Sequence, residues 1–332
     1  MSQDTKYTTR EKIKAANQIY ATYPLFNRVL EDIYECHYSP EINGEDDPDC
    51  LLLTGEAGAG KTTIYKTYAQ NYPRQETDEG SIVPIIYTPI PVPATVKGLV
   101  QAILKELGDP LYEKGATRDQ TNRAYDLLAA CQVELIVLDE FHHFIDRDSN
   151  KVLKTVCDWL KLLILNTKIP VVLFGLPESK RILEVDLDDK QLSRRFKYRY
   201  ELIPFPRNDL GMKLFRQFLS DIEEQLPLEE KSGLANKSMA ERIYYATDGT
   251  IAHVMTLIRK GATFAIKQDL NRLDLEILNT IYERHLKHEK PFKYTEPFLV
   301  KKLDFEASYA LDLNKRISQN NRTSNLRSIL HS

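Results

Sequence analysis

Five short apolar runs, separated by segments with a helical pattern, constrain the fold of this chain more than any other feature. The runs lie at 50–54, 82–88, 134–139, 170–175 and 198–203. The segments between them repeat apolar residues every three or four positions, as amphipathic helices do. Alternation of strands and helices is typical of a parallel sheet covered by helices. The sequence therefore predicts an α/β fold with a parallel five-stranded sheet.

Helical patterns flank this region on both sides. Apolar residues at helical spacing cover 9–36, with an interruption near Pro24, and an acidic, turn-rich segment follows. Beyond residue 209 the strands stop and amphipathic helices run to about residue 288. The last twenty residues, 313–332, hold four cations and no acids, a composition typical of a disordered tail. We expect four parts: a helical N-terminal extension with linker (1–49), an α/β core (50–205), a helical domain (206–288) and a C-terminal extension with a basic, disordered tail (289–332).

The stretch TGEAGAGKTT, residues 54–63, joins the first predicted strand to the first helix of the core. It contains a complete G-x-x-x-x-G-K-[ST] pattern, in which glycines let backbone N–H groups surround a phosphate and the lysine reaches the β and γ oxygens. An ordinary glycine-rich turn is the alternative, but the strand–loop–helix context favours ATP as the ligand. The residues expected to bind ATP are Gly55, Glu56, Ala57, Gly58, Ala59, Gly60, Lys61, Thr62 and Thr63.

The run ELIVLDE, residues 134–140, supplies the acids that such a site needs. Asp139 emerges at the end of an apolar strand and, together with the hydroxyl of Thr62, is expected to hold Mg²⁺. Glu140 follows directly and is expected to orient and activate the attacking water. A strand that ends in acids is common, so the pair indicates an ATPase only because it follows the phosphate loop by about 80 residues.

The histidines give weaker evidence, in this case for a metal site. His142 and His143 follow Glu140, but adjacent side chains point in different directions and the sequence offers no evident third ligand. We expect them to serve in a loop or in contact with a partner. His285 and His288 lie on a charged helix and are expected at the surface.

Composition excludes several classes of protein. A net charge of −3 on 332 residues argues against a generally basic nucleic-acid binder but leaves room for a local basic strip. The longest apolar stretch, 169–176, is far shorter than the roughly 20 residues of a membrane helix. The N-terminal residues lack the apolar core of a signal peptide. Cys36, Cys50, Cys131 and Cys157 form no C-x-x-C pair. We expect a cytoplasmic protein without a membrane segment, its thiols reduced and buried.

The motifs GEAGAGKTT, LIVLDE, VVLFGLPES and QLSRRF, in this order and followed by a helical lid, resemble an AAA+ ATPase. The helical segment YPLFNRVLEDIYE before LLLTGEAGAGKTT resembles the TniB/TnsC family of transposition regulators, relatives of the phage Mu target-selection ATPase. The resemblance covers residues 9–270. It implies a homo-oligomer, a ring or helical filament, that binds duplex DNA in an ATP-dependent and largely sequence-independent way. Such an assembly marks the transposition target and recruits the transposase and target-selection proteins.

The resemblance also implies roles for particular residues. Arg194 and Arg195 match the place of the arginine finger that completes a neighbouring subunit's site, although a pair of solvated arginines is the alternative. The DNA contacts fall on the stretch between the second and third predicted strands. The candidates there are Lys97, Lys114, Thr117 and Arg118, although Lys97 has the alternative of a solvated helix residue.

Two positions depart from the family pattern. Leu176 stands where a polar sensor residue is common, and His253 stands where an arginine usually contacts the nucleotide. We therefore expect ATP hydrolysis that is slow and dependent on assembly. Three other functions stay open: a replication initiator or helicase loader of the same fold, a signalling P-loop ATPase that binds proteins and not DNA, and, less favoured, a small-molecule kinase.

Overall fold

The chain divides into two units by its internal contacts. We call Pro24–Ile203 the sheet unit, and the residues up to Tyr23 together with those from Pro204 onward the helical unit. The structure, a computed structural model, describes residues 8–43, 47–78, 80–145, 150–185, 191–288, 293 and 295–315.

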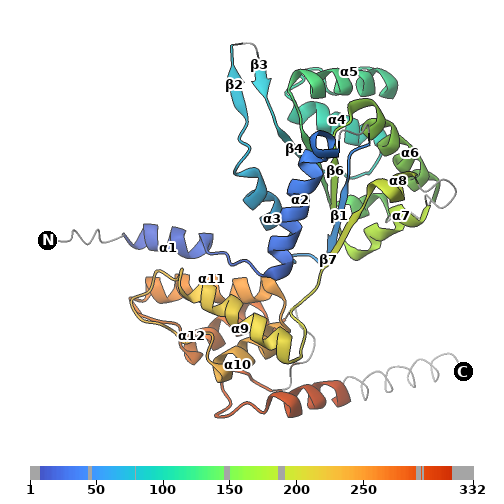
Figure 1. The fold of residues 1–332 in the computed structure, drawn as a ribbon. Helices are drawn as coiled ribbons and strands as arrows, with labels where there is room; N and C mark the ends of the chain where they lie inside the picture. Colours follow the sequence, from blue (N-terminus) through green and yellow to red (C-terminus); the bar gives the residue numbers. More distant parts are fainter. Residues whose placement is uncertain are drawn as a thin grey trace, which may run out of the picture. The chain divides into compact units, whose positions relative to one another are not determined.

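A five-stranded sheet forms the centre of the sheet unit (Figure 1). Its strands are β1 (Leu51–Gly55), β4 (Ile85–Pro89), β5 (Leu135–Asp139), β6 (Val171–Gly175) and β7 (Tyr198–Leu202). They lie in the order β4-β5-β6-β1-β7, and every pairing is parallel. All residues of β1, β5 and β6 are buried, as expected for the interior of a sheet covered on both faces. The predicted α/β fold with a parallel five-stranded sheet is confirmed.

Helices and short 3-10 turns lie before the first strand and between the strands of the sheet. They are α2 (Pro24–Asn43), α3 (Lys61–Ala69), α4 (Val96–Glu106), α5 (Thr117–Ala130), α6 (Asn150–Thr167), α7 (Arg181–Val185) and α8 (Gln191–Arg195), with the 3-10 turns η1 (Phe141–Phe144) and η2 (Pro177–Lys180). Pro24 breaks the N-terminal helical pattern as predicted, since proline is suited to the first turn of a helix. The N-terminus of α4 is capped by Thr95, whose side chain accepts a hydrogen bond from the Gly98 N–H at 3.0 Å.

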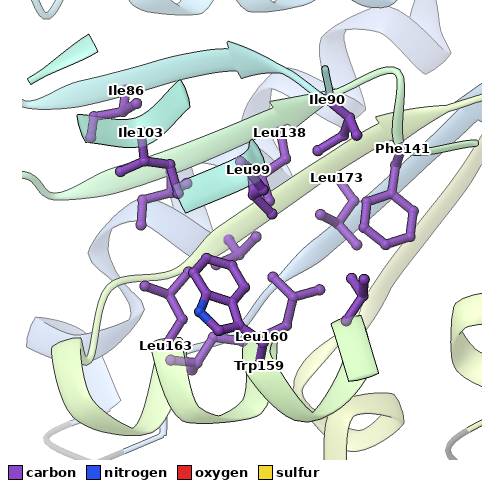
Figure 2. Close-up of a cluster of buried hydrophobic side chains, with 14 of the residues drawn as sticks. Ile86, Ile90, Leu99, Ile103, Leu138, Phe141, Trp159, Leu160, Leu163 and Leu173 are labelled. Carbon is purple, nitrogen blue, oxygen red and sulfur yellow. The ribbon is translucent and has the colours of Figure 1, made fainter. Parts of the chain in front are cut away.

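The apolar core of the sheet unit joins strand and helix side chains (Figure 2). Leu138 of β5 and Leu173 of β6 are fully buried and belong to the same cluster as Leu99 of α4 and Leu160 of α6. Trp159, the one tryptophan of the chain, lies in this cluster with 7% of its surface exposed. The core therefore fixes the strands whose carboxyl ends carry the motifs.

A two-stranded hairpin was not predicted from the sequence. It consists of β2 (Gln75–Thr77) and β3 (Gly80–Ile82), which pair antiparallel and are largely exposed. The predicted strand at 82–88 is corrected by this finding, because Ile82 belongs to β3 and β4 begins only at Ile85. Pro84 lies between them and has no N–H to donate, while its carbonyl accepts hydrogen bonds from Glu134 and Leu135.

All regular secondary structure in the described part of the helical unit is helical. They are α1 (Thr9–Gln18), α9 (Asp209–Glu223), α10 (Lys237–Thr247), α11 (Ile251–Lys267), α12 (Leu275–His285) and a last helix at 305–315. Ile19, just after α1, is 2% exposed in their core, and its carbonyl accepts a hydrogen bond from Nε of Arg259 at 3.0 Å. The division into two units groups α1 with the helical unit and α2 with the sheet unit. The finer division into four parts stays a prediction.

Two buried cations attach the C-terminal segment to α10. Arg242 donates hydrogen bonds to the carbonyls of Pro297 and Val300 at 2.5 and 2.9 Å. Lys293 lies 2.6 Å from a carboxylate oxygen of Asp248. Helical structure continues to residue 315, so the predicted disorder of 313–332 is corrected for its first three residues, and 316–332 lie outside the described residues. Within the described ranges we find no helix long and apolar enough to cross a membrane.

Candidate active site

The predicted phosphate loop connects β1 to α3. Gly58 and Gly60 have φ angles of +75° and +106°, in the left-handed region that glycine adopts without strain. Gly60 is the residue before the first turn of α3, so the loop leads directly into a helix N-terminus. Backbone N–H groups at such an end are oriented to bind an anion.

Lys61 provides the positive charge of the loop. Its ammonium group donates hydrogen bonds to the carbonyls of Gly55 at 2.5 Å and Glu56 at 3.1 Å, and only 8% of the residue is exposed. Burial lowers the pKa of this lysine, whereas the carboxylates of Asp139 and Glu140 raise it. A bound anion would relieve the cost of burying the cation, which makes the site suited to phosphate.

Asp139 is buried at the carboxyl end of β5 and both of its oxygens have partners. The hydroxyl of Tyr87 donates to Oδ2, and the backbone N–H of Glu140 donates to Oδ1 at 2.7 Å. Tyr87 comes from β4 and stacks on Tyr65 of α3 with a centroid distance of 4.1 Å. Burial and the neighbouring Asp139 carboxylate raise the pKa of Tyr87. The sequence gives no signal for this tyrosine, because its role depends on β4 lying beside β5.

Glu140 follows with a strained backbone and an accessible side chain. Its φ of +57° is left-handed, which is uncommon for a residue other than glycine and is frequent at functional sites. About half of the side chain, 48%, is exposed. Its carboxylate lies 3.3 Å from Nδ1 of His142, at the start of η1.

The two histidines of η1 lie closer to an acid than the sequence suggested. One potential ligand atom from each of Glu140, His142 and His143 lies within 4.8 Å of the other two. The expectation that no third ligand is near these histidines is therefore wrong. Spacing along the sequence could not reveal this, since it depends on the left-handed turn at Glu140.

A cavity of about 310 Å³ brings the predicted residues together. Loop residues 57–63, Asp139 and Glu140 line it, along with His142 and Leu176, while Gly55 and Glu56 hold Lys61 through their carbonyls. A cation, a hydroxyl and two carboxylates converge on one cavity, and this set of groups fits a nucleoside triphosphate with Mg²⁺. Ser179, three residues after Leu176 in the sequence, is also buried. Its hydroxyl has no hydrogen-bond partner among the described residues.

The remaining candidates are not among the residues that line this cavity. Arg195 is paired with Asp47 at 2.7 Å and has only 10% of its side chain exposed, whereas the adjacent Arg194 is exposed. His253 lies on α11 in the helical unit. The proposed DNA contacts lie on α4, on the following loop and at the start of α5: Lys97, Lys114 and Arg118 are exposed and Thr117 is half-buried.

This fold and this site define an AAA+ ATPase. Solved structures with less than 25% sequence identity to this chain support the fold assignment. The Cdc6p protein of Pyrobaculum aerophilum gives a TM-score of 0.57 at 16% identity, covering 82% of this chain and 71% of that one. The ORC2 protein of Aeropyrum pernix in ADPNP and ADP complexes gives 0.56 at 13% identity, with 82% and 71% covered. The ORC1 protein of the same organism in complex with DNA gives 0.55 at 16%, with 82% and 69% covered.

Residues 12–202 match the family described as Bacterial TniB protein, which is more than half of the chain. The protein belongs to the TniB family, as the resemblance implied. It is also similar to General secretion pathway protein A of Aeromonas hydrophila, with 32% identity over 179 residues. That match covers 50% of this chain but 29% of the other protein, so the chain spans less than a third of that relative's length.

Proposed function

We propose that this TniB-family ATPase assembles on duplex DNA in its ATP form, largely without sequence preference, marks a transposition target and recruits the transposase. The observation that carries the proposal is the cavity where Lys61, Asp139 and Glu140 converge, in a chain of this family. ATP hydrolysis then loosens the assembly.

Each residue of the cavity has a role in this proposal. Bound ATP supplies the phosphoryl group that water attacks, and Mg²⁺ neutralises its charge. Lys61 binds the phosphate oxygens, and Thr62 and Asp139 hold the metal. Glu140 accepts a proton from the attacking water. Leu176 gives the cavity an apolar side chain where a polar sensor is common in the family, which supports slow turnover.

The DNA contact is proposed for the stretch from α4 to α5. Arg123 of α5 braces the intervening loop: Nε donates to Asp109 at 2.6 Å, and Nη2 donates to the Leu111 carbonyl at 2.7 Å. This brace holds a loop that carries the exposed Lys114. Cations on an ordered surface bind phosphates without reading bases, which agrees with weak sequence preference. An ORC1 protein of similar fold was solved with DNA, which supports the choice of ligand.

Assembly would place an arginine of one subunit at the nucleotide of the next. Arg194 suits this role better than Arg195, because Arg194 is exposed and Arg195 is engaged with Asp47. Head-to-tail contacts of this kind produce either a ring or a helical filament. The transposase would meet a surface that exists only in the assembled form.

The test is a measurement of duplex DNA binding by fluorescence anisotropy, with ATP, with ADP and without nucleotide, over a salt series. We expect ATP-dependent binding that increases with duplex length. The double variant Lys97→Glu/Lys114→Glu should bind more weakly and lower the log–log salt slope by about one per lost contact. Lys154→Glu/Lys213→Glu makes the same charge change at exposed positions outside this stretch and should behave as wild type.

Two results would decide against the proposal. Equal DNA binding with ATP, with ADP and without nucleotide would exclude an assembly held together by ATP. An unchanged salt slope in the Lys97/Lys114 variant would exclude the stretch from α4 to α5 as the DNA contact. The fold shared with ORC proteins favours a replication initiator as the second candidate. ATP-dependent binding confined to particular DNA sequences would support that candidate instead.

A further inference from the structure

We propose that Glu140, His142 and His143 form a binding site for one Zn²⁺ ion at the edge of the nucleotide cavity. Their potential ligand atoms lie within 4.8 Å of one another. Two nitrogen donors and one carboxylate are a common set for zinc. Imidazole also selects zinc over Mg²⁺, which prefers oxygen ligands.

The distances suit tetrahedral coordination. Ligands about 2.0–2.1 Å from zinc stand about 3.3 Å from each other at the corners of a tetrahedron. Nδ1 of His142 and Oε2 of Glu140 are 3.3 Å apart. The third atom, from His143, lies within 4.8 Å of the other two, and the rings of the two histidines are adjacent, with centroids 4.3 Å apart.

A second observation points to a ligand at this place. His142 is 8% exposed, and its Nδ1 lies 3.3 Å from a carboxylate oxygen of Glu140 without the geometry of a hydrogen bond. A buried imidazole nitrogen without a well-formed hydrogen bond has a cost that a metal bond would lower. The residue also lines the nucleotide cavity, so the site has an entry path from solvent.

The backbone at Glu140 explains why three nearly consecutive residues converge. Its left-handed conformation, with φ +57° and ψ +34°, turns the chain from β5 directly into η1. This turn brings the carboxylate of Glu140 beside the ring of His142. Asp139 is not in this group of ligand atoms, and its oxygens lie against the hydroxyl of Tyr87 and the Glu140 N–H. The zinc site is therefore distinct from the Mg²⁺ position proposed at Thr62 and Asp139.

Zinc at this site would inhibit ATP hydrolysis, and this consequence rests on the proposed function of Glu140 as the base. Coordination to zinc withdraws electron density from the carboxylate, which makes it a much weaker base for the attacking water. Lys61, Thr62 and Asp139 stay available, so nucleotide binding continues. Zinc would thus hold the protein in its ATP form.

The site itself is tested without nucleotide. Full-length protein is titrated with ZnCl₂ in competition with a chromogenic chelator. We expect one equivalent to bind with saturation. His143→Asn should weaken the affinity at least about tenfold. The exposed His285→Asn is the matched control and should keep it. Because His142 is buried, His142→Gln is used only if circular dichroism shows the wild-type fold. Absence of saturable binding, or equal affinity in His143→Asn, would overturn the site.

The consequence is tested by turnover of Mg²⁺-ATP with and without zinc. Wild type should lose turnover at one equivalent of zinc and regain it with a zinc-selective chelator. The turnover of His143→Asn with zinc, compared with its own turnover without zinc, should show little inhibition. Stoichiometric zinc binding without loss of ATP turnover would support the zinc site but overturn the proposed inhibition. Absence of turnover in zinc-free wild type would overturn the proposed function while the binding result stands.

Discussion

Glu140 carries the clearest prediction at the scale of single residues. Glu140→Gln keeps the size of the side chain but removes the base, so we expect ATP binding to survive while turnover falls by about 10²- to 10⁴-fold. Complexes of the variant with DNA should outlast those of wild type in ATP. The measurements are phosphate release and the lifetime of the DNA complexes after dilution.

Glu113→Gln is the matched control, because Glu113 is exposed in the α4–α5 loop and should not affect turnover. Wild-type turnover in Glu140→Gln would show that this carboxylate is not the base. Loss of turnover without longer-lived DNA complexes would keep the active site but reject hydrolysis as the release step.

The environment of His37 in α2 lets us predict how the stability of the sheet unit depends on pH. Its ring nitrogens lie 2.8 Å from the hydroxyl of Tyr68 and 3.0 Å from the carboxylate of Glu134. Burial lowers the pKa of His37, although Glu134 opposes this effect. The unfolded chain therefore takes up the proton more readily than the folded one. Neutral His37 makes its full contribution to the free energy of unfolding above the pKa of histidine in the unfolded chain, about 6.5. This contribution is lost as the pH falls toward the pKa of His37 in the folded protein.

Urea unfolding followed by the fluorescence of Trp159 should therefore give a lower free energy of unfolding at pH 5.5 than at pH 7.5. His37→Phe should reduce this difference, whereas the exposed His285→Phe should not. A pH dependence identical in wild type and His37→Phe would refute the assignment to His37.

At the scale of secondary structure, α8 ends in two arginines with different environments. Arg194→Ala should leave the stability of the sheet unit unchanged but reduce ATP turnover and assembly on DNA, because an exposed arginine is free to reach a neighbouring subunit. Arg195→Ala should instead lower the free energy of unfolding by about 1 kcal/mol, because it removes the pair with Asp47, whose own side chain is 57% exposed. Analytical ultracentrifugation with DNA and Trp159 fluorescence separate the two effects. A stable but assembly-deficient Arg195→Ala would reverse the assignment.

Much of this element-level architecture was predictable, and the exceptions have physical causes. The runs at 134–139 and 170–175 were predicted as strands because fully buried parallel strands are apolar on both faces. Strand β2 was missed, since all three of its residues are exposed and have no apolar face. The phosphate loop and the Asp139-Glu140 pair are local motifs, so the sequence was enough to predict that they share a site. The contacts of Tyr87 with Asp139 and of Asp47 with Arg195 join distant segments, which no local pattern encodes.

At the scale of the whole molecule, the chain enters the sheet unit after Tyr23 and leaves it after Ile203. Deleting residues 1–23 should lower the free energy of unfolding of the helical unit by about 2 kcal/mol or more, because Ile19 leaves its core and Arg259 loses a carbonyl partner. The transition reported by Trp159 should not shift, since that residue belongs to the sheet unit. Thermal melts by circular dichroism and by tryptophan fluorescence make the comparison. Deletion of residues 1–7 alone is the control, and an equal effect of both deletions would show that α1 is not the cause.

The discontinuity of the helical unit has a consequence for synthesis on the ribosome. Ile19 and its partner Arg259 are 240 positions apart, a gap that takes roughly 10–50 s to translate. A ten-residue helix such as α1 is barely stable alone in water, so it has to wait for its partners. The sheet unit is one continuous segment that is fully translated before those partners. A chain interrupted after residue 203 would therefore leave the ribosome with a complete phosphate loop and sheet, but with α1 exposed and unpaired, ready for a chaperone or a protease.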